Sequence, residues 1–482
     1  MSFPPYPPRP SPRKRPARAR VARAKAKRMP WGWLEGYILS LTFMQALLFL
    51  PGIATIRPVI RISTYAMGFL AWVMVARKGK AGAGISSFPA RPWLIFCMCW
   101  LMLMLVHPTN YSLKSAIAQC LLYIAVLSPA FWAGAALVSP KQIARLMAVL
   151  FLCNALSSLV GIGQVYYPEQ FNPPVIPAMN GIFQGEDLKY EAADGRRILR
   201  PCGLTDTPGA VAPAGATTAL IGLCWALRPI GIFKRLACLS LAFAGVAVIY
   251  FTQVRAQMVM LGVCMTTLVG LLLVQGNARR ALTLGLGGLG VVAGAFLWVG
   301  QTVGSKAAER FGSLLSSESG NLVYQGRGGF VREAFEKTIW EYPLGAGMGW
   351  YGMIYAMFLD QTRLSTIWAE IMIQGFLFDG GIPLLVGYMG AIGVALYDSL
   401  RISLTTPDRD LRFWAAVIVA QNLGLLANCF SYLTFLSGMG PPFWLFSAAL
   451  HAADAQIRAS ERRPEASRTP SAWPRPGGAF AR

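Results

Sequence analysis

Long apolar runs decide most of what this chain can fold into. Segments of roughly twenty apolar residues recur along it, each long enough to cross the ~30 Å hydrocarbon core of a bilayer as a helix. The hydrophobic fraction of 55% and the charged fraction of 13% differ from those of soluble globular proteins. Because lipid offers the backbone no hydrogen-bond partners, we predict an all-α fold, a polytopic membrane helix bundle of about 12 transmembrane helices. The predicted spans are 33–55, 57–76, 92–107, 115–138, 145–165, 209–227, 236–251, 258–275, 281–300, 370–397, 413–432 and 441–455.

The distribution of Lys and Arg predicts the orientation of the bundle, because basic residues collect in cytoplasmic loops. With both termini inside, the predicted inner segments carry a net charge equal to the +23 of the whole chain. Two long loops, 166–208 and 301–369, then face outward. The second lies between spans nine and ten and is expected to be partly helical.

Basic, polar segments flank the predicted bundle. The expected organisation is a disordered basic arm at 1–30, a bundle at 31–300, the large outer loop at 301–369, the last three spans at 370–455 and a disordered tail at 456–482. Lys and Arg of the arm alternate with Pro and Ala, and they either bind anionic lipid headgroups or serve only to fix the topology. The basic balance therefore predicts membrane lipids as partners and no nucleic acid.

Neither a metal nor another cofactor is predicted. Of nine cysteines only Cys202 falls in an outer loop, and no zinc-ligand spacing occurs. The two histidines, His107 and His451, lie far apart and at opposite predicted faces, which excludes clustered imidazole ligands. His107 follows the third span, where it is either an interfacial polar residue or a supporting member of a site.

Three arginines near the predicted outer boundary are candidate site residues. Arg200 precedes the turn at which the chain re-enters the membrane, and it either lies at the mouth of the bundle or is an interfacial residue that pairs with Asp206 or with a lipid phosphate. Arg255 lies in a short turn between two spans, where an arginine is costly unless it has a partner or lines a wet cavity. Arg327 stands in a Gly-rich turn before an amphipathic helix predicted at 330–342.

Two carboxylates fall in the tenth predicted span. Burying a charged group in the membrane costs free energy, so both are functional candidates. Glu370 alternatively is an interfacial acid near a helix N-terminus, where the helix dipole favours it. Asp379 is expected to pair with a polar neighbour in another helix or to support the site. The glycines of Gly345–Gly349 lack the strand and the Lys-Ser/Thr of a nucleotide loop, so we expect them to allow close approach of the backbone to a ligand or a helix.

At these positions the chain resembles the bacterial O-antigen ligase and O-antigen polymerase superfamily. Arg200–Gly203 followed by Pro208-Gly209 is similar to the family's Arg-x-x-Gly…Pro segment. Thr252–Arg255 is similar to its Ser-x-Ser-Arg turn. Gly326-Arg327 followed by Pro343–Gly347 is similar to its large-loop signature.

The resemblance covers 195–395 by motif and the whole chain by hydropathy, and it implies a metal-independent glycosyltransferase of the bacterial inner membrane. The implied donor is a glycan on a polyprenyl diphosphate carrier, used at the periplasmic face. Because a guanidinium grips phosphate oxygens bidentately, the implied diphosphate ligands are Arg200, Arg255 and Arg327, the last also catalytic. The acceptor hydroxyl needs a base, and Glu370 is the implied one.

One departure from the family bears on the reaction. Family ligases carry a His-Asn pair at the end of the large loop, about eleven residues before a Gly-x-x-Gly in the next span. Counting back the same distance from Gly381 in this chain leads to Glu370. This favours an O-antigen or exopolysaccharide polymerase over a ligase that transfers glycan to a lipid core. A lipid-linked glycan transporter or flippase is the competing class, and other polysaccharide assembly proteins are further implied partners.

Overall fold

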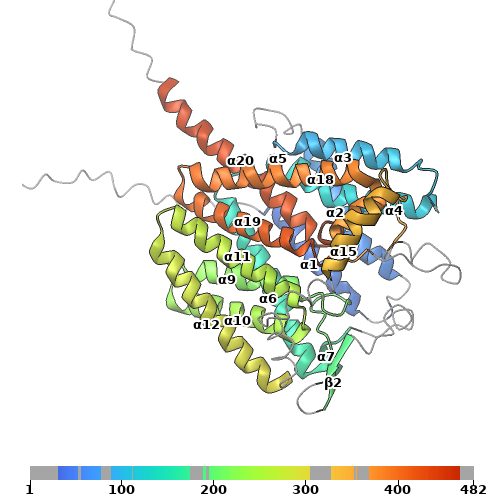
Figure 1. Cartoon of the computed structure of the whole chain (residues 1–482). Coiled ribbons are helices and arrows are strands. Elements are labelled where there is room, and N and C mark those ends of the chain that lie inside the picture. Colours follow the sequence, from blue (N-terminus) through green and yellow to red (C-terminus); the bar gives the residue numbers. More distant parts are fainter. Residues whose placement is uncertain are drawn as a thin grey trace, which may run out of the picture. The chain divides into compact units, whose positions relative to one another are not determined.

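The computed structural model describes residues 31–50, 52, 56–77, 88–110, 112–173, 188–191, 195–303, 327–351, 354 and 369–466. The predicted basic arm lies outside these residues, as do 304–326 and 355–368 of the predicted large loop. Helices dominate the described part, as predicted, and each predicted span coincides with a helix (Figure 1).

Eight helices in the described part of the chain are long and apolar enough to cross a membrane. They are α2 (Arg57–Arg77), α4 with α5 (Leu113–Leu127 and Pro129–Ala136), α6 (Gln142–Tyr166), α10 (Ile232–Thr252), α11 (Arg255–Val274), α12 (Ala278–Val303), α18 (Met372–Thr405) and α19 (Arg409–Asn428).

The other four predicted spans correspond to helices that are shorter or more polar. Three are α1 with a 3-10 turn η2 (Trp33–Ala46 and Leu47–Phe49), α3 (Arg91–Met104) and α9 (Ala212–Ala226). The fourth, α20 (Gly440–Ala466), becomes charged in its second half, and its helix includes the start of the tail that was predicted to be disordered. The count of twelve crossings therefore stays a prediction.

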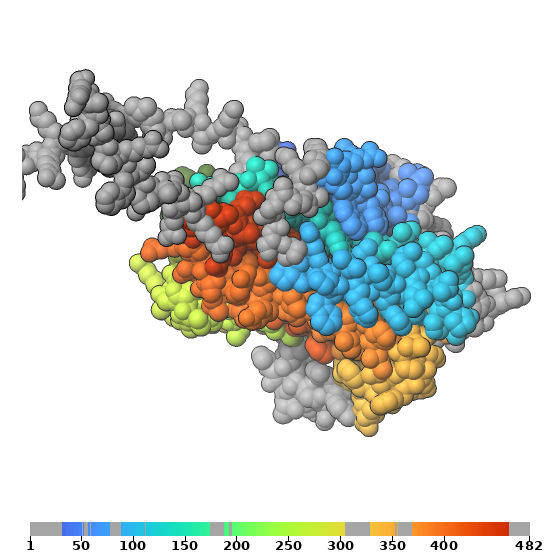
Figure 2. All heavy atoms as spheres, turned by 90° about the horizontal axis from the view of Figure 1, so that it is seen from above, coloured from blue at the N-terminus to red at the C-terminus, as the bar shows by residue number. Residues whose placement is uncertain are grey.

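The helices form two packed groups. In one group α10 packs against α9, α12 and α6, while in the other α18 packs against α3, α19 and α20 (Figure 1). Contacts between α11 and α19 join the two groups. Figure 2 shows α18, in orange, lying against the blue residues of α3, with the gold residues that follow Arg327 at one end.

The predicted loop 166–208 contains structure that the all-α prediction missed. A short helix α7 (Pro168–Phe171) follows α6, and strand β1 (Lys189–Glu191) pairs antiparallel with β2 (Arg197–Leu199). The paired residues Tyr190 and Ile198 are both buried. Three-residue strands are too short to give a period-two pattern that distinguishes them from a loop.

The helix predicted at 330–342 is present, but its buried face is not the one that a regular α-helical period predicts. It consists of α15 (Arg327–Glu333), a π-helical turn η5 (Ala334–Thr338) and α16 (Ile339–Glu341). Ala334 and Thr338 are buried as predicted, whereas Phe335, assigned to the same apolar face, is 47% exposed. A π turn holds one more residue than an α turn, so it shifts the faces away from a 3.6-residue period.

Candidate functional site

A cavity of about 1410 Å³ lies among α1, α2, α4, α11, α15, the segment that precedes α9 and the segment between α19 and α20. Its lining combines apolar side chains, such as Phe69 and Leu121, with three arginines. The arginines are Arg61, Arg200 and Arg255, and the described lining residues include one carboxylate, Asp206. Cavities for drug-sized ligands usually measure about 300–1,000 Å³, so this one has room for an amphiphile with a charged head.

Arg200 is positioned by the segment that follows it, which is anchored to α6. The side-chain oxygen of Gln164 accepts hydrogen bonds from the backbone N–H groups of Cys202 and Gly203, at 2.7 and 2.9 Å. Gly203 has φ +70°, and a Cβ there would lie 2.5 Å from the Ser157 hydroxyl, so only glycine lets the chain approach α6 this closely. The Arg-x-x-Gly motif therefore holds Arg200 at the cavity wall.

Arg255 begins α11 directly after a strained turn. Gln253 is the one non-glycine residue of the described chain with positive φ, at 56°, and it is buried against the cavity. Such a conformation costs about 1–3 kcal/mol and persists where the surroundings impose it, commonly at functional sites. The turn reverses the chain from α10 to α11 and places Arg255 at the cavity, as predicted for an arginine that lines a polar space.

A buried ion-pair cluster adjoins these arginines. Asp206, predicted as an alternative partner of Arg200, accepts hydrogen bonds from Arg57 Nε and, at 2.7 Å, from Arg61 Nη2. Asp206 and Arg57 are buried, while the Arg61 side chain is 26% exposed and lines the cavity. Arg57 and Arg61 lie at the start of the second predicted span, where arginines can extend to the lipid interface, but here both are paired with Asp206.

The large loop reaches the cavity through α15. Gly328 and Val331 line the cavity, whereas the side chain of the preceding Arg327 lies outside the described ones. Arg327 is the first residue of α15, so the helix begins earlier than the predicted residue 330 and includes Arg327 and the two glycines that were expected to form a turn before it. Its assignment to the diphosphate stays a prediction.

Glu370 lies beside α15 rather than on the cavity wall. Its backbone N–H donates to the side chain of Gln374 at 3.4 Å, and Gln374 donates to the Glu333 carboxylate at 3.5 Å. Among the described residues that line the cavity, Glu370 does not occur, and neither do Asp379 and His107. The geometry therefore joins Arg200 with Arg255 and leaves the role of Glu370 as a prediction.

Asp379 is the centre of a buried hydrogen-bond network, which confirms the expected pairing with polar neighbours. Its carboxylate accepts hydrogen bonds from Gln119 Nε2 (2.7 Å), Tyr123 OH (2.9 Å), Tyr351 OH (2.7 Å) and the backbone N–H of Gly349 (3.3 Å). Burial and then the neighbouring carboxylate raise the pKa of Tyr351 well above its usual value, so this phenol stays protonated and donates. Asp379 therefore connects α4, the large loop and α18.

Beside this network the segment Pro343–Trp350 docks into a break in α18. Gly381 has φ 63° and ψ −155°, and a Cβ there would lie 2.2 Å from the carbonyl oxygen of Pro343. Hydrogen bonds run from Ile382 N to Pro343 O (2.9 Å) and from Ala346 N to Phe378 O (2.8 Å). The close approach expected of the glycines is thus made to a helix.

His107 belongs to the turn that receives this segment from the other side. Its Nδ1 lies 2.7 Å from the Thr109 hydroxyl, which donates to Ala346 O at 2.6 Å. Asn110 Oδ1 accepts from Met348 N at 2.8 Å. His107 therefore supports the docked loop, as the prediction of an interfacial or supporting residue allowed.

We expect Asp379→Ala to destabilise the protein more than any substitution of an exposed acid. Each donor left without an acceptor in the interior costs about 1–3 kcal/mol, and three side chains donate to this carboxylate. The free energy of unfolding should fall by at least about 3 kcal/mol, measured by thermal unfolding of the detergent-purified protein. Asp408→Ala, which removes only the N-cap of α19, is the control and should cost about 1 kcal/mol. Equal shifts for both variants would show that the network does not stabilise the fold.

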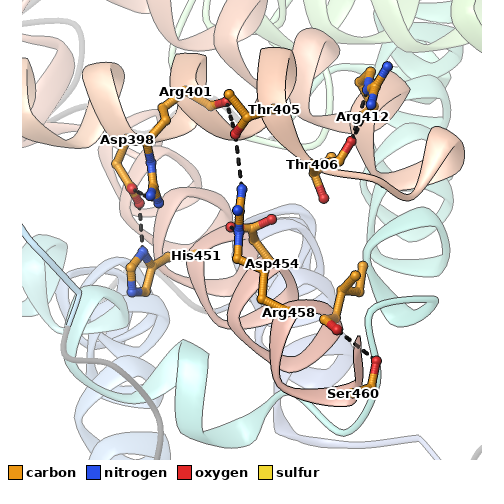
Figure 3. Close-up of polar contacts among 10 residues, drawn as sticks. Asp398, Arg401, Thr405, Thr406, Arg412, His451, Asp454, Arg458 and Ser460 are labelled. Atoms are coloured by element: carbon orange, nitrogen blue, oxygen red, sulfur yellow. Dashed lines mark hydrogen bonds and ion pairs between the residues drawn. The ribbon is translucent and has the colours of Figure 1, made fainter. Parts of the chain in front are cut away.

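A second polar cluster joins α18, α19 and α20 away from the cavity (Figure 3). Asp398 accepts from Arg401 at 2.7 Å and lies 2.7 Å from Nδ1 of His451. Arg458 pairs with Asp454 at 2.7 Å and donates to the Thr405 hydroxyl at 2.9 Å. Arg412 of α19 donates to the backbone carbonyl of Thr406 at 2.9 Å, and Arg401 and Arg458 pair with acids, so the cluster ties the ends of these helices together.

Other reactive groups do not form a site in the described part of the chain. Burial raises the pKa of the Cys202 thiol to about 12, so it is not a thiolate at neutral pH. The described residues contain no group of three or more His, Cys, Asp or Glu side chains arranged to hold a metal ion. The candidate site is therefore the arginine-lined cavity.

The chain was also compared with known proteins. No family model matches it, and no curated protein sequence matches it either.

Proposed function

We propose that this protein is a polysaccharide polymerase of the bacterial inner membrane. It transfers a glycan from a polyprenyl diphosphate carrier to a sugar hydroxyl of the acceptor at the periplasmic face. The observation that carries this proposal is the meeting of Arg200 and Arg255, from separate segments of the chain, in one cavity that also has apolar walls. In this proposal the chain crosses the membrane about twelve times, with both termini in the cytoplasm.

The cavity suits the chemistry of a lipid diphosphate donor. A diphosphate leaves without protonation when its growing charge is neutralised, and guanidinium groups do this through two parallel hydrogen bonds each. Fixed cations stabilise such charge more strongly in a site from which water is largely excluded than in bulk water. Apolar side chains of α2 and α4, including Phe69 and Leu121, offer a surface for the prenyl chain.

The acceptor hydroxyl also needs a proton acceptor. Asp206 is the carboxylate on the described cavity wall, but both of its oxygens accept hydrogen bonds from arginines, which makes it a poor base. Glu370 stands at the start of α18 next to α15, two residues of which line the cavity. We therefore assign the base to Glu370, which an acceptor entering along α15 can reach.

Glycan analysis in a deletion strain tests this function. A polymerase deletion removes long chains while single repeats are still transferred to their final acceptor. Accumulation of lipid-linked polymer would instead identify a ligase. Retention of unpolymerised lipid-linked repeats at the cytoplasmic face would identify a transporter.

A further inference from the structure

The cluster of Arg57, Asp206 and Arg61 has more positive charge than its own members balance. Two guanidinium groups share one carboxylate, and Asp206 and Arg57 are almost completely buried. The two terminal nitrogens of Arg57 are buried without a hydrogen-bond partner. Both carboxylate oxygens of Asp206 therefore accept hydrogen bonds, while N–H groups of the two arginines are left without an acceptor in the cluster.

Uncompensated charge in an apolar bundle is costly, so an excess cation there is functional by default. Arg61 is the member through which the excess reaches the cavity, because its side chain is 26% exposed and lines the wall. The same wall also carries Arg200 and Arg255, the two arginines to which the proposed function assigns the diphosphate. An anionic ligand held by these two arginines can therefore also balance the excess charge at Arg61.

We propose that Arg61 is a further ligand of the donor diphosphate, oriented by Asp206, which Arg57 fixes in turn. This inference rests on the proposed function and adds a residue from α2 that the motifs do not include. Asp206 binds one edge of the Arg61 guanidinium through Nη2 and so limits the directions in which its remaining N–H groups point. Arg61 is a binding residue in this scheme, and Asp206 and Arg57 are positioning residues.

The third arginine explains how the cavity selects a diphosphate over a monophosphate. A diphosphate has more negative charge and more terminal oxygens than a monophosphate, spread over two phosphorus atoms, so it can engage three guanidinium groups with less crowding. Removing Arg61 therefore weakens diphosphate binding strongly and monophosphate binding little. A variant without Arg61 should therefore lose both its affinity for the diphosphate and its preference for diphosphate over monophosphate.

The test measures binding of radiolabelled polyprenyl diphosphate and of polyprenyl monophosphate with the same chain length to the full-length protein in detergent. Arg61→Gln should weaken diphosphate binding about 10- to 100-fold, because it removes hydrogen bonds between charged groups. Monophosphate affinity should change by less than about threefold, and Arg61→Lys should restore part of the diphosphate affinity. Excess phosphatidylglycerol should not displace the probe.

Arg228→Gln is the matched control, since Arg228 is also ion-paired and 21% exposed but lies outside the described cavity lining. It should leave both affinities unchanged. Normal diphosphate binding in Arg61→Gln, with weakened binding in Arg200→Ala, would overturn the role of Arg61 and leave the proposed function intact. Absence of diphosphate binding by the unmodified protein, or displacement of the probe by phosphatidylglycerol, would overturn both.

Discussion

Replacing Glu370 by glutamine is expected to lower the rate of polymer formation by roughly 10²–10⁴-fold, because an amide cannot accept the proton of the acceptor hydroxyl. The substitution keeps the size and polarity of the side chain. Gln374 connects this position to Glu333 of α15, and Gly328 and Val331 of the same helix line the cavity. Binding of the lipid-linked donor should remain near normal, because the arginines hold it. Single-turnover assays together with donor-binding measurements separate the two effects.

Glu336→Gln is the control for this prediction. Glu336 is an exposed acid on the neighbouring helix that pairs with Arg332, so its loss should leave turnover unchanged. Glu370→His should recover part of the activity, if the proposed kinship with O-antigen ligases holds, since histidine stands at the corresponding place in those enzymes. Full activity in Glu370→Gln, with reduced protein abundance in Glu370→Ala, would show instead that Glu370 only stabilises the start of α18.

Arg255→Ala should reduce turnover by about 10²–10³-fold, as expected when a fixed group that stabilises developing charge is removed. The strained turn at Gln253 and the start of α11 hold Arg255 at the cavity. Arg255→Lys should restore little, because an ammonium group is a point charge and cannot bind two phosphate oxygens in the same fork geometry. Polymer length in cells and turnover of the purified protein both report the loss.

Arg279→Ala provides the comparison for Arg255. Arg279 also lies in the first turn of its helix, α12, but it is exposed and does not contribute to the described cavity lining. Both variants should accumulate to near-normal amounts in the membrane. If Arg255→Ala polymerises normally, the cavity does not bind the donor through this residue, and the proposed clamp is wrong.

Hydropathy located the helices of this protein well but misplaced some of their ends. The span predicted at 370–397 continues as α18 to Thr405, because Asp398 and Arg401 pair with each other and resemble loop residues only when read singly. The same effect hides the second half of α20, where Arg458 pairs with Asp454 one turn away. The sequence Gly380-Gly381-Ile382-Pro383 predicts a weakened helix at the break, whereas the contact of Gly381 with Pro343 is long-range and no local pattern encodes it.

The sequence identified a site residue only where placing a charged side chain in the membrane would cost free energy. Arg255 was recognisable because an arginine between two apolar runs is unfavourable unless it has a partner or lines a polar cavity. Arg61 and Asp206 were not joined in advance, because they are 145 residues apart and each has an ordinary interfacial interpretation. One signal was available: Arg57 and Arg61 are four residues apart and so share a face of one apolar helix.

The docking of Pro343–Trp350 into α18 has a consequence for how the protein is made. Synthesis proceeds from the N-terminus, so the turn that contains Thr109 and Asn110 is in place long before the docking segment exists. That segment must then wait, because its bonds to Phe378 and Ile382 require a helix that has not yet been translated. The part of the cavity wall supplied by α15 is therefore completed late, and nascent chains that end before α18 have the earlier helices without a complete cavity.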